Sequence, residues 1–196
     1  EEQCAALGIA MTCAKAEVSV AVSQAVVSVT AMGVVKKGQQ ICLTQAGVGQ
    51  DLVLCGSIGT EGVLRILEER KEELSGRFVP AFIRQIQSLN QEMETVEAVR
   101  KAAQMRIQTG EPLVTAMQQI GSGGILASLW ELTEAAKVGM QIEMSRISIR
   151  QECVEVCEYY HLNPYLMTSA GAVLMTSRDG NALVRCLEES GARASV

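Results

Sequence analysis

The chain has 196 residues, carries a formal net charge of −5 at pH 7, and is 48% apolar but only 3% aromatic. This length fits one large domain, or one domain with part of a second, with a core of aliphatic residues and methionine. Acidic and basic residues are mixed and no basic block occurs, which argues against nucleic acid as a partner. Because no apolar run can span a bilayer and no signal-peptide pattern occurs, a cytoplasmic protein without a membrane partner is expected.

The first 45 residues are predicted to hold the end of a helix followed by extended segments. Glu2–Leu7 has a helical pattern, and Gly8 suits the position just after a helix. Ile9–Met11 is predicted to be a short strand. Alternating and β-branched residues predict strand structure between Val18 and Val35. Gln40–Thr44 is predicted to be short and extended.

The rest of the chain mixes strands and helices without strict βαβ repetition. A buried strand is predicted at Asp51–Gly56, followed by a helix that starts between Gly59 and Gly62 and has one charged, solvated face. Further helices are predicted to start at Pro80 and to cover 94–108, 125–137, 151–160 and 179–190. Further strands are predicted at 113–117, 140–144 and 167–175. This order predicts an α+β fold in which helices pack against a sheet.

Cysteine and histidine usage bounds the possible metal and disulfide chemistry. Seven cysteines are spread through apolar segments, and an odd, scattered set is not typical of a disulfide framework. Cys153 and Cys157 share one helix face and are interpreted as core thiols, with a pair of metal ligands as the alternative. His161 is the single histidine, so a histidine-rich metal site is excluded, and no metal ligand is predicted in this chain.

The central motif is Gly121-Ser122-Gly123-Gly124, between an apolar run and a helical pattern that starts at Ile125. Glycines allow a positive φ, and the free N–H groups at a helix start favour an anion such as phosphate. The alternative is a tight strand-to-helix turn that packing alone requires. The motif is neither a Walker P-loop nor GxGxxG, since its spacing differs and no Lys-Ser/Thr follows.

A family resemblance is carried by GQDLVLCGSIGTEGVLRILEERKEEL and by GSGGILASLWELTEAAKVGMQIEMSRISIRQECVEVCEYYHLNPYLMTSAGAVLM. Both resemble the C-terminal domain of the AIR synthase (PurM-like) superfamily, nearest to its AIR synthase-related and hydrogenase-maturation branch. The earlier stretch LGIAMTCAKAEVSVAVSQAVVSVTAMGVV resembles the end of that superfamily's N-terminal domain. The resemblance implies an α+β fold with a mixed sheet and helices packed against it, preceded by a partial N-terminal α+β segment. The implied domains are 1–45, a remnant of the ATP-binding and dimerisation domain, and 46–196, the C-terminal domain.

The resemblance also implies a chemistry. Members use ATP to phosphorylate an oxygen of a small molecule, or to activate an amide or carbamoyl oxygen. ATP and Mg²⁺ are therefore the implied cofactors, held mostly outside this chain, and a homodimer and a small-molecule substrate are the implied partners. The implied cofactor-binding residues here are Lys15 and Glu17. The implied substrate- or phosphate-binding residues are Gln118, Gln119, Ser122, Gly123, Gly124, Glu61, Ser169 and Gly171.

Two motifs depart from the family pattern. Cys13-Ala14-Lys15-Ala16-Glu17 stands where a Gly-Gly-His-Thr-Glu-like turn is usual, and the stretch from Gln118 to Gly124 lacks the family's ionisable residues. Glutamine forms hydrogen bonds but is neither a general base nor a carboxylate ligand for Mg²⁺. This chain alone is therefore expected to be inactive.

Three interpretations stay open. The chain is part of an ATP-dependent enzyme, a degenerate non-catalytic paralogue that binds a metabolite or partner, or a structural module whose valine-rich strands pair with another chain. For Glu61, an exposed acid in a first helical turn is the structural alternative to a binding role.

Overall fold

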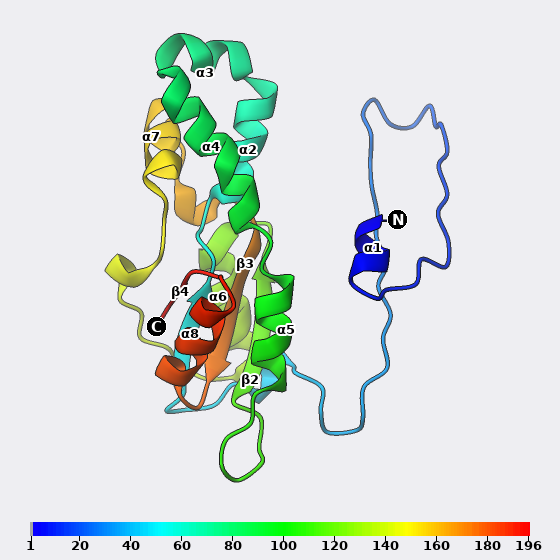
Figure 1. The fold of residues 1–196 in the computed structure, drawn as a ribbon, viewed down its shortest axis with the longest axis vertical. Coiled ribbons are helices and arrows are strands. Elements are labelled where there is room, and N and C mark those ends of the chain that lie inside the picture. Colours follow the sequence, from blue (N-terminus) through cyan, green and yellow to red (C-terminus); the bar gives the residue numbers. More distant parts are fainter. Residues whose placement is uncertain (1) are drawn as a thin grey trace. The chain divides into compact units, whose positions relative to one another are not determined.

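The computed structural model describes residues 2–196 (Figure 1), which form one unit up to Lys37 and a second unit from Gly38 to Val196. The domain limits implied by the resemblance, 1–45 and 46–196, stay a prediction.

The first unit contains one helix, α1 (Glu2–Ala6), among its described residues. Gly8 has a φ of 69° and donates its N–H to the Ala5 carbonyl, so the predicted helix end is confirmed. The strands predicted at Ile9–Met11 and between Val18 and Val35 are absent from the described residues of this unit. Alternation indicates a strand only where another strand offers backbone partners, and side chains such as Val18 and Val20 are fully exposed here.

The second unit is built on a four-stranded sheet of order β2-β3-β1-β4. Its strands are β1 (Asp51–Cys55), β2 (Val114–Ile120), β3 (Ser169–Ser177) and β4 (Ala194–Ser195). The strand pairs β1–β3, β1–β4 and β2–β3 are antiparallel. The β2–β3 register is irregular near the end of β2, where Gln119 pairs with Val173 but Ile120 pairs with Ser169.

Helices surround this sheet. They are α2 (Thr60–Glu69), α3 (Lys71–Arg77), α4 (Pro80–Glu92), α5 (Val96–Gln104), α6 (Gly124–Ala136), α7 (Gln151–Tyr159) and α8 (Gly180–Glu189). Short 3₁₀ turns lie at Leu43–Gln45, Met144–Arg146 and Pro164–Leu166. Among these helices, none is long and apolar enough to cross a membrane.

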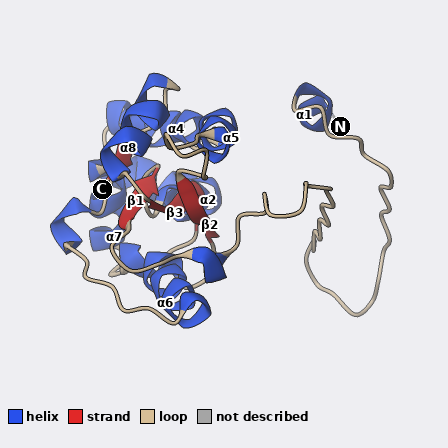
Figure 2. Cartoon of the chain, turned by 90° about the horizontal axis from the view of Figure 1, so that it is seen from below, coloured by secondary structure: helices blue, strands red, loops and turns tan. Residues whose placement is uncertain are grey.

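The two faces of the sheet are covered by different helices (Figure 2). On one face, Leu54 and Leu174 pack with Ile125, Leu129 and Leu132 of α6. The opposite face packs against α5 and α8, through a cluster that includes Val53, Met175, Ala98, Leu183 and Leu187. A third cluster lies among α2, α3, α4 and α7. The predicted α+β class, with helices packed against a sheet, is confirmed.

Several predicted boundaries need correction. The segment at 140–144 is not a strand: it is a loop that leads into the 3₁₀ turn Met144–Arg146. The alternating apolar residues Met140 and Ile142 pack against the core, although the segment pairs with no strand of the described residues. Likewise, Gln40–Thr44 runs into a 3₁₀ turn, the helix predicted at 94–108 is confined to Val96–Gln104, and β4 was not predicted.

Candidate functional site

The glycine motif forms the turn between β2 and α6. Gly123 and Gly124 have φ values of 82° and 66°, so the predicted positive φ is confirmed. Gly121, Ser122 and Gly123 are exposed. Within the described residues, the N–H groups of Ser122 and Gly123 have no hydrogen-bond acceptor. Exposed N–H groups at the start of a 13-residue helix form a local positive potential that suits an anion.

Packing explains only part of this motif. A Cβ on Gly124 would lie 2.3 Å from the Tyr165 carbonyl oxygen, and a Cβ on Gly123 would lie 2.6 Å from Cβ of Ala127. A Cβ on Gly121 would meet no atom within 4 Å. The tight-turn interpretation therefore accounts for Gly123 and Gly124, whereas nothing in the packing requires glycine at position 121.

Gln118 and Gln119 do not point to a common pocket. Successive strand residues face opposite sides of a sheet. Gln118 lies on the α6 side, where its amide nitrogen donates to the Glu131 carboxylate, and its amide oxygen is buried without a partner among the described atoms. Gln119 is exposed. Gln118 therefore contacts the flank of α6, well beyond the first turn of that helix, and the roles predicted for both glutamines stay predictions.

Glu61, Ser169 and Gly171 lie together beside the start of β3, but their polar groups are already engaged. The Glu61 carboxylate accepts the Ala170 N–H at 2.9 Å. The fully buried Ser169 hydroxyl accepts the Gly59 N–H at 2.8 Å and donates to the Met167 carbonyl. These bonds join the start of α2 to β3.

Gly171 is required by its backbone. It has a φ of 85°, and a Cβ there would lie 2.5 Å from the Met93 carbonyl oxygen. Its own carbonyl accepts the Thr95 hydroxyl at 2.6 Å. Ser169 also pairs with Ile120, and the turn at 164–166 packs on Gly124, so this group lies at the same end of the sheet as the glycine motif.

Lys15 and Glu17 lie in the first unit. Their side chains form an ion pair of 2.6 Å and are 74% and 68% exposed. The pair is isolated on the surface of an extended segment, and the cofactor-binding role of both residues stays a prediction.

The cysteines of α7 are core thiols. Cys153 and Cys157 are buried, and burial, together with the nearby Cys157, raises the pKa of Cys153 to about 12. Burial likewise raises the pKa of Cys157 to about 11 and that of Cys55 to about 11. No group of three or more His, Cys, Asp or Glu suited to a metal ion occurs in the part of the chain that the structure describes.

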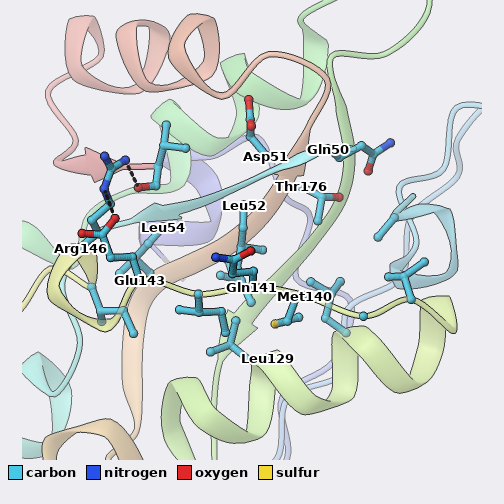
Figure 3. Close-up of a pocket in the computed structure, with 18 of the residues that line it drawn as sticks. Gln50, Asp51, Leu52, Leu54, Leu129, Met140, Gln141, Glu143, Arg146 and Thr176 are labelled. Carbon is cyan, nitrogen blue, oxygen red and sulfur yellow. Dashed lines mark hydrogen bonds and ion pairs between the residues drawn. The ribbon is translucent and has the colours of Figure 1, made fainter. Parts of the chain in front are cut away.

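A groove that the sequence did not reveal lies on the α6 side of the sheet (Figure 3). Its volume is about 1000 Å³. It is lined by β1, β3, α6, the loop Ala46–Gln50 and the segment from Val138 to Ile147. Its walls come from segments more than 100 residues apart, so no local pattern could have shown it.

The amino-acid sequence of this chain is similar to those of known proteins. Residues 47–196 match the family model "AIR synthase related protein, C-terminal domain". A protein of Methanocaldococcus jannaschii, named for hydrogenase expression and formation, is 24% identical over 180 residues, covering 92% of this chain and 49% of that protein. Carbamoyl dehydratase HypE of Azotobacter vinelandii is 28% identical over 148 residues, covering 76% of this chain and 39% of the relative. The chain thus spans about half, or less, of the length of these relatives.

Solved structures share the fold. HypE from E. coli superposes with a TM-score of 0.61 at 16% identity, covering 84% of this chain and 47% of that one. A HypE structure in complex with ATP gives a TM-score of 0.58 at 17% identity, covering 79% of this chain and 44% of that one. The resemblance seen in the sequence is confirmed: the chain belongs to the AIR synthase-related family, and residues 47–196 match its C-terminal domain.

Proposed function

We propose that this chain is part of an ATP-dependent enzyme that activates an amide or carbamoyl oxygen, or phosphorylates a small molecule. Two relatives support the reaction class: one is a carbamoyl dehydratase, and a HypE has been solved with ATP. In this chain, the observation that carries the proposal is the pair of exposed, unpaired N–H groups of Ser122 and Gly123 at the start of α6.

These groups suit a phosphate or an oxygen that gains negative charge. Backbone donors that are fixed before the reaction stabilise developing charge without reorganising. These residues are a poor set of Mg²⁺ ligands, because the glutamines offer no carboxylate and Glu61, one oxygen of which accepts the Ala170 N–H, is the single carboxylate among them. We therefore assign the binding of an anionic oxygen to these residues. We assign neither a metal ligand nor a general base among them.

A substitution at Ser122 tests this assignment. Ser122→Glu places a negative charge beside the free N–H groups without disturbing the core, since Ser122 is exposed. Calorimetric titration with Mg-ATP is expected to show binding weakened about tenfold or more, as for the loss of a charge-assisted contact. Ser75→Glu, on the exposed surface of α3, makes the same charge change and is the matched control. Equal affinity of the two variants would exclude the glycine motif as the site.

The alternative is a non-catalytic paralogue that binds a metabolite or partner. Two departures from the family pattern favour it. The stretch 118–124 lacks the family's ionisable residues, and Cys13-Ala14-Lys15-Ala16 stands where Gly-Gly-His-Thr is usual. Because most of the nucleotide site is expected outside this chain, this second function would be supported by a folded full-length protein that fails to bind Mg-ATP.

A homodimer remains part of the proposal. Its support is the run of exposed apolar side chains between Val18 and Val35, since contiguous exposed apolar surface marks contact sites. Light scattering over a dilution series should show a dimer that dissociates on dilution. A monomer at high concentration would contradict this expectation.

A further inference from the structure

The groove on the α6 side of the sheet has an apolar interior. Leu52 and Leu54 of β1 form its floor, and Leu129 of α6 forms one wall. The opposite wall is the segment 138–147, here named the strap, which directs Met140 toward the same space (Figure 3). A volume of about 1000 Å³ is large enough for a small organic molecule.

The strap does not seal this groove by strand pairing. Within the described residues, the N–H groups of Gly139, Met140, Gln141 and Ile142 have no backbone acceptor. The strap is held further along, where the Ser195 hydroxyl donates to the Arg146 carbonyl at 3.1 Å. Its apolar side chains therefore cover the groove while its backbone is free to adjust.

Three charged side chains around the groove already have partners within the fold. The Asp51 carboxylate accepts the Gly180 N–H at 2.7 Å. Glu143 and Arg146 pair with each other at 2.9 Å and are 65% and 61% exposed, at the outer rim of the groove. Placing an ion over the leucine floor would remove it from water without a partner, which is costly. The groove therefore suits an uncharged molecule.

One end of the groove offers hydrogen-bonding groups. Thr115 donates to Oε1 of Gln50 at 2.7 Å, and its oxygen lies 2.7 Å from the Thr176 hydroxyl. Gly47 donates its N–H to the same Gln50 oxygen at 2.9 Å. A hydroxyl has one proton, so Thr176 donates to Thr115 and keeps acceptor capacity. The Gln50 amide nitrogen has no acceptor among the described residues.

We propose that this groove binds an uncharged, mainly apolar small molecule whose carbonyl or amide end lies at Gln50 and Thr176. The apolar body would lie over Leu52 and Leu54, and the carbonyl oxygen would accept from the Gln50 amide nitrogen. This binding does not depend on ATP or on the glycine motif.

Photolabelling with benzophenone, an uncharged diaryl ketone that inserts into nearby C–H bonds on irradiation, tests the proposal. Labelled peptides are mapped by mass spectrometry over a range of benzophenone concentrations. Because the new bond forms at the ketone carbon, saturable labelling is expected at the residues around Gln50 and Thr176, where the proposal places the carbonyl group.

Two variants and one control make the test specific. Gln50→Glu keeps the oxygen that binds Gly47 and Thr115 but removes the amide donor, and should lower the labelling affinity about tenfold. Leu52→Trp fills the floor and should abolish saturable labelling. Trp130→Gln changes an apolar side chain that is 66% exposed on α6 and should have no effect.

Circular dichroism of each variant verifies that it is folded. Labelling that is unchanged in Gln50→Glu and Leu52→Trp would overturn the proposal. Labelling confined to the exposed valines between Val18 and Val35, or absent from the folded wild-type chain, would overturn it as well.

Discussion

Replacing Gly124 with alanine is expected to lower the free energy of unfolding by about 3–5 kcal/mol, the sum of backbone strain and overpacking. Gly124 has a φ of 66°, where an L-residue is strained. Its new Cβ would lie 2.3 Å from the Tyr165 carbonyl oxygen and 2.6 Å from the Leu166 carbonyl carbon. Both neighbours are backbone atoms, so no rotamer change relieves the contact. Urea unfolding followed by circular dichroism measures the effect.

Gly121→Ala is the matched control in the same turn. A Cβ at position 121 has no neighbour within 4 Å, so the change in unfolding free energy should stay within about 0.5 kcal/mol. Similar destabilisation by the two variants would show that the turn as a whole resists substitution. It would contradict the distinction between a glycine required by packing and a glycine that packing leaves free.

Alkaline pH should destabilise the protein through its buried thiols. The pKa of Cys153 is raised from 9.0 to about 12, and the pKa values of Cys157 and Cys55 to about 11, in each case chiefly by burial. Above pH 9 the unfolded chain loses these protons while the folded chain keeps them. The unfolded state then binds fewer protons, so the unfolding free energy falls as pH rises, by about 1.4 kcal/mol per pH unit for each thiol.

The double variant Cys153→Ala and Cys157→Ala isolates this contribution from tyrosine and lysine titration. Urea unfolding of both proteins between pH 8 and pH 11, under reducing conditions, should give a shallower pH dependence for the variant. The difference should approach two protons, or about 2.7 kcal/mol per pH unit. Equal slopes would mean that the thiols are as accessible to water in the folded chain as in the unfolded one.

Local sequence patterns were sufficient to predict the helices that are marked by a characteristic residue at their start. Pro80 starts α4, Asp179 caps α8, and Gly123 and Gly124 start α6. Such signals act through a side chain or a backbone angle at the boundary itself. For this reason the prediction of a strand, a glycine turn and a helix at the centre of the chain is confirmed.

Patterns that depend on a distant partner were less informative. The alternation at 140–144 and between Val18 and Val35 is suited to a strand, but neither segment has a strand partner in the described residues. β4 comprises only Ala194 and Ser195, too few residues for a periodic signal. Strand pairing is set by tertiary contacts, which periodicity does not contain.

The candidate site was predictable only in part for the same reason. The resemblance brought together the glycine motif, Glu61 and Ser169, and all of them lie at one end of the sheet. It could not show that the Ser169 hydroxyl and one oxygen of the Glu61 carboxylate accept backbone N–H groups. It also placed Gln118 and Gln119 together, although a strand that continues to Ile120 directs them to opposite faces.

The most direct test of the anion site at the start of α6 is a nitrogen-15 NMR titration of the folded chain with inorganic phosphate and then with Mg-ATP. An anion site there should give saturable shifts of the Ser122 and Gly123 amide signals, with smaller changes along the rest of α6. Shifts that are absent from these amides while other signals move, or no saturable shift at all, would contradict the assignment of an anion site to the glycine motif.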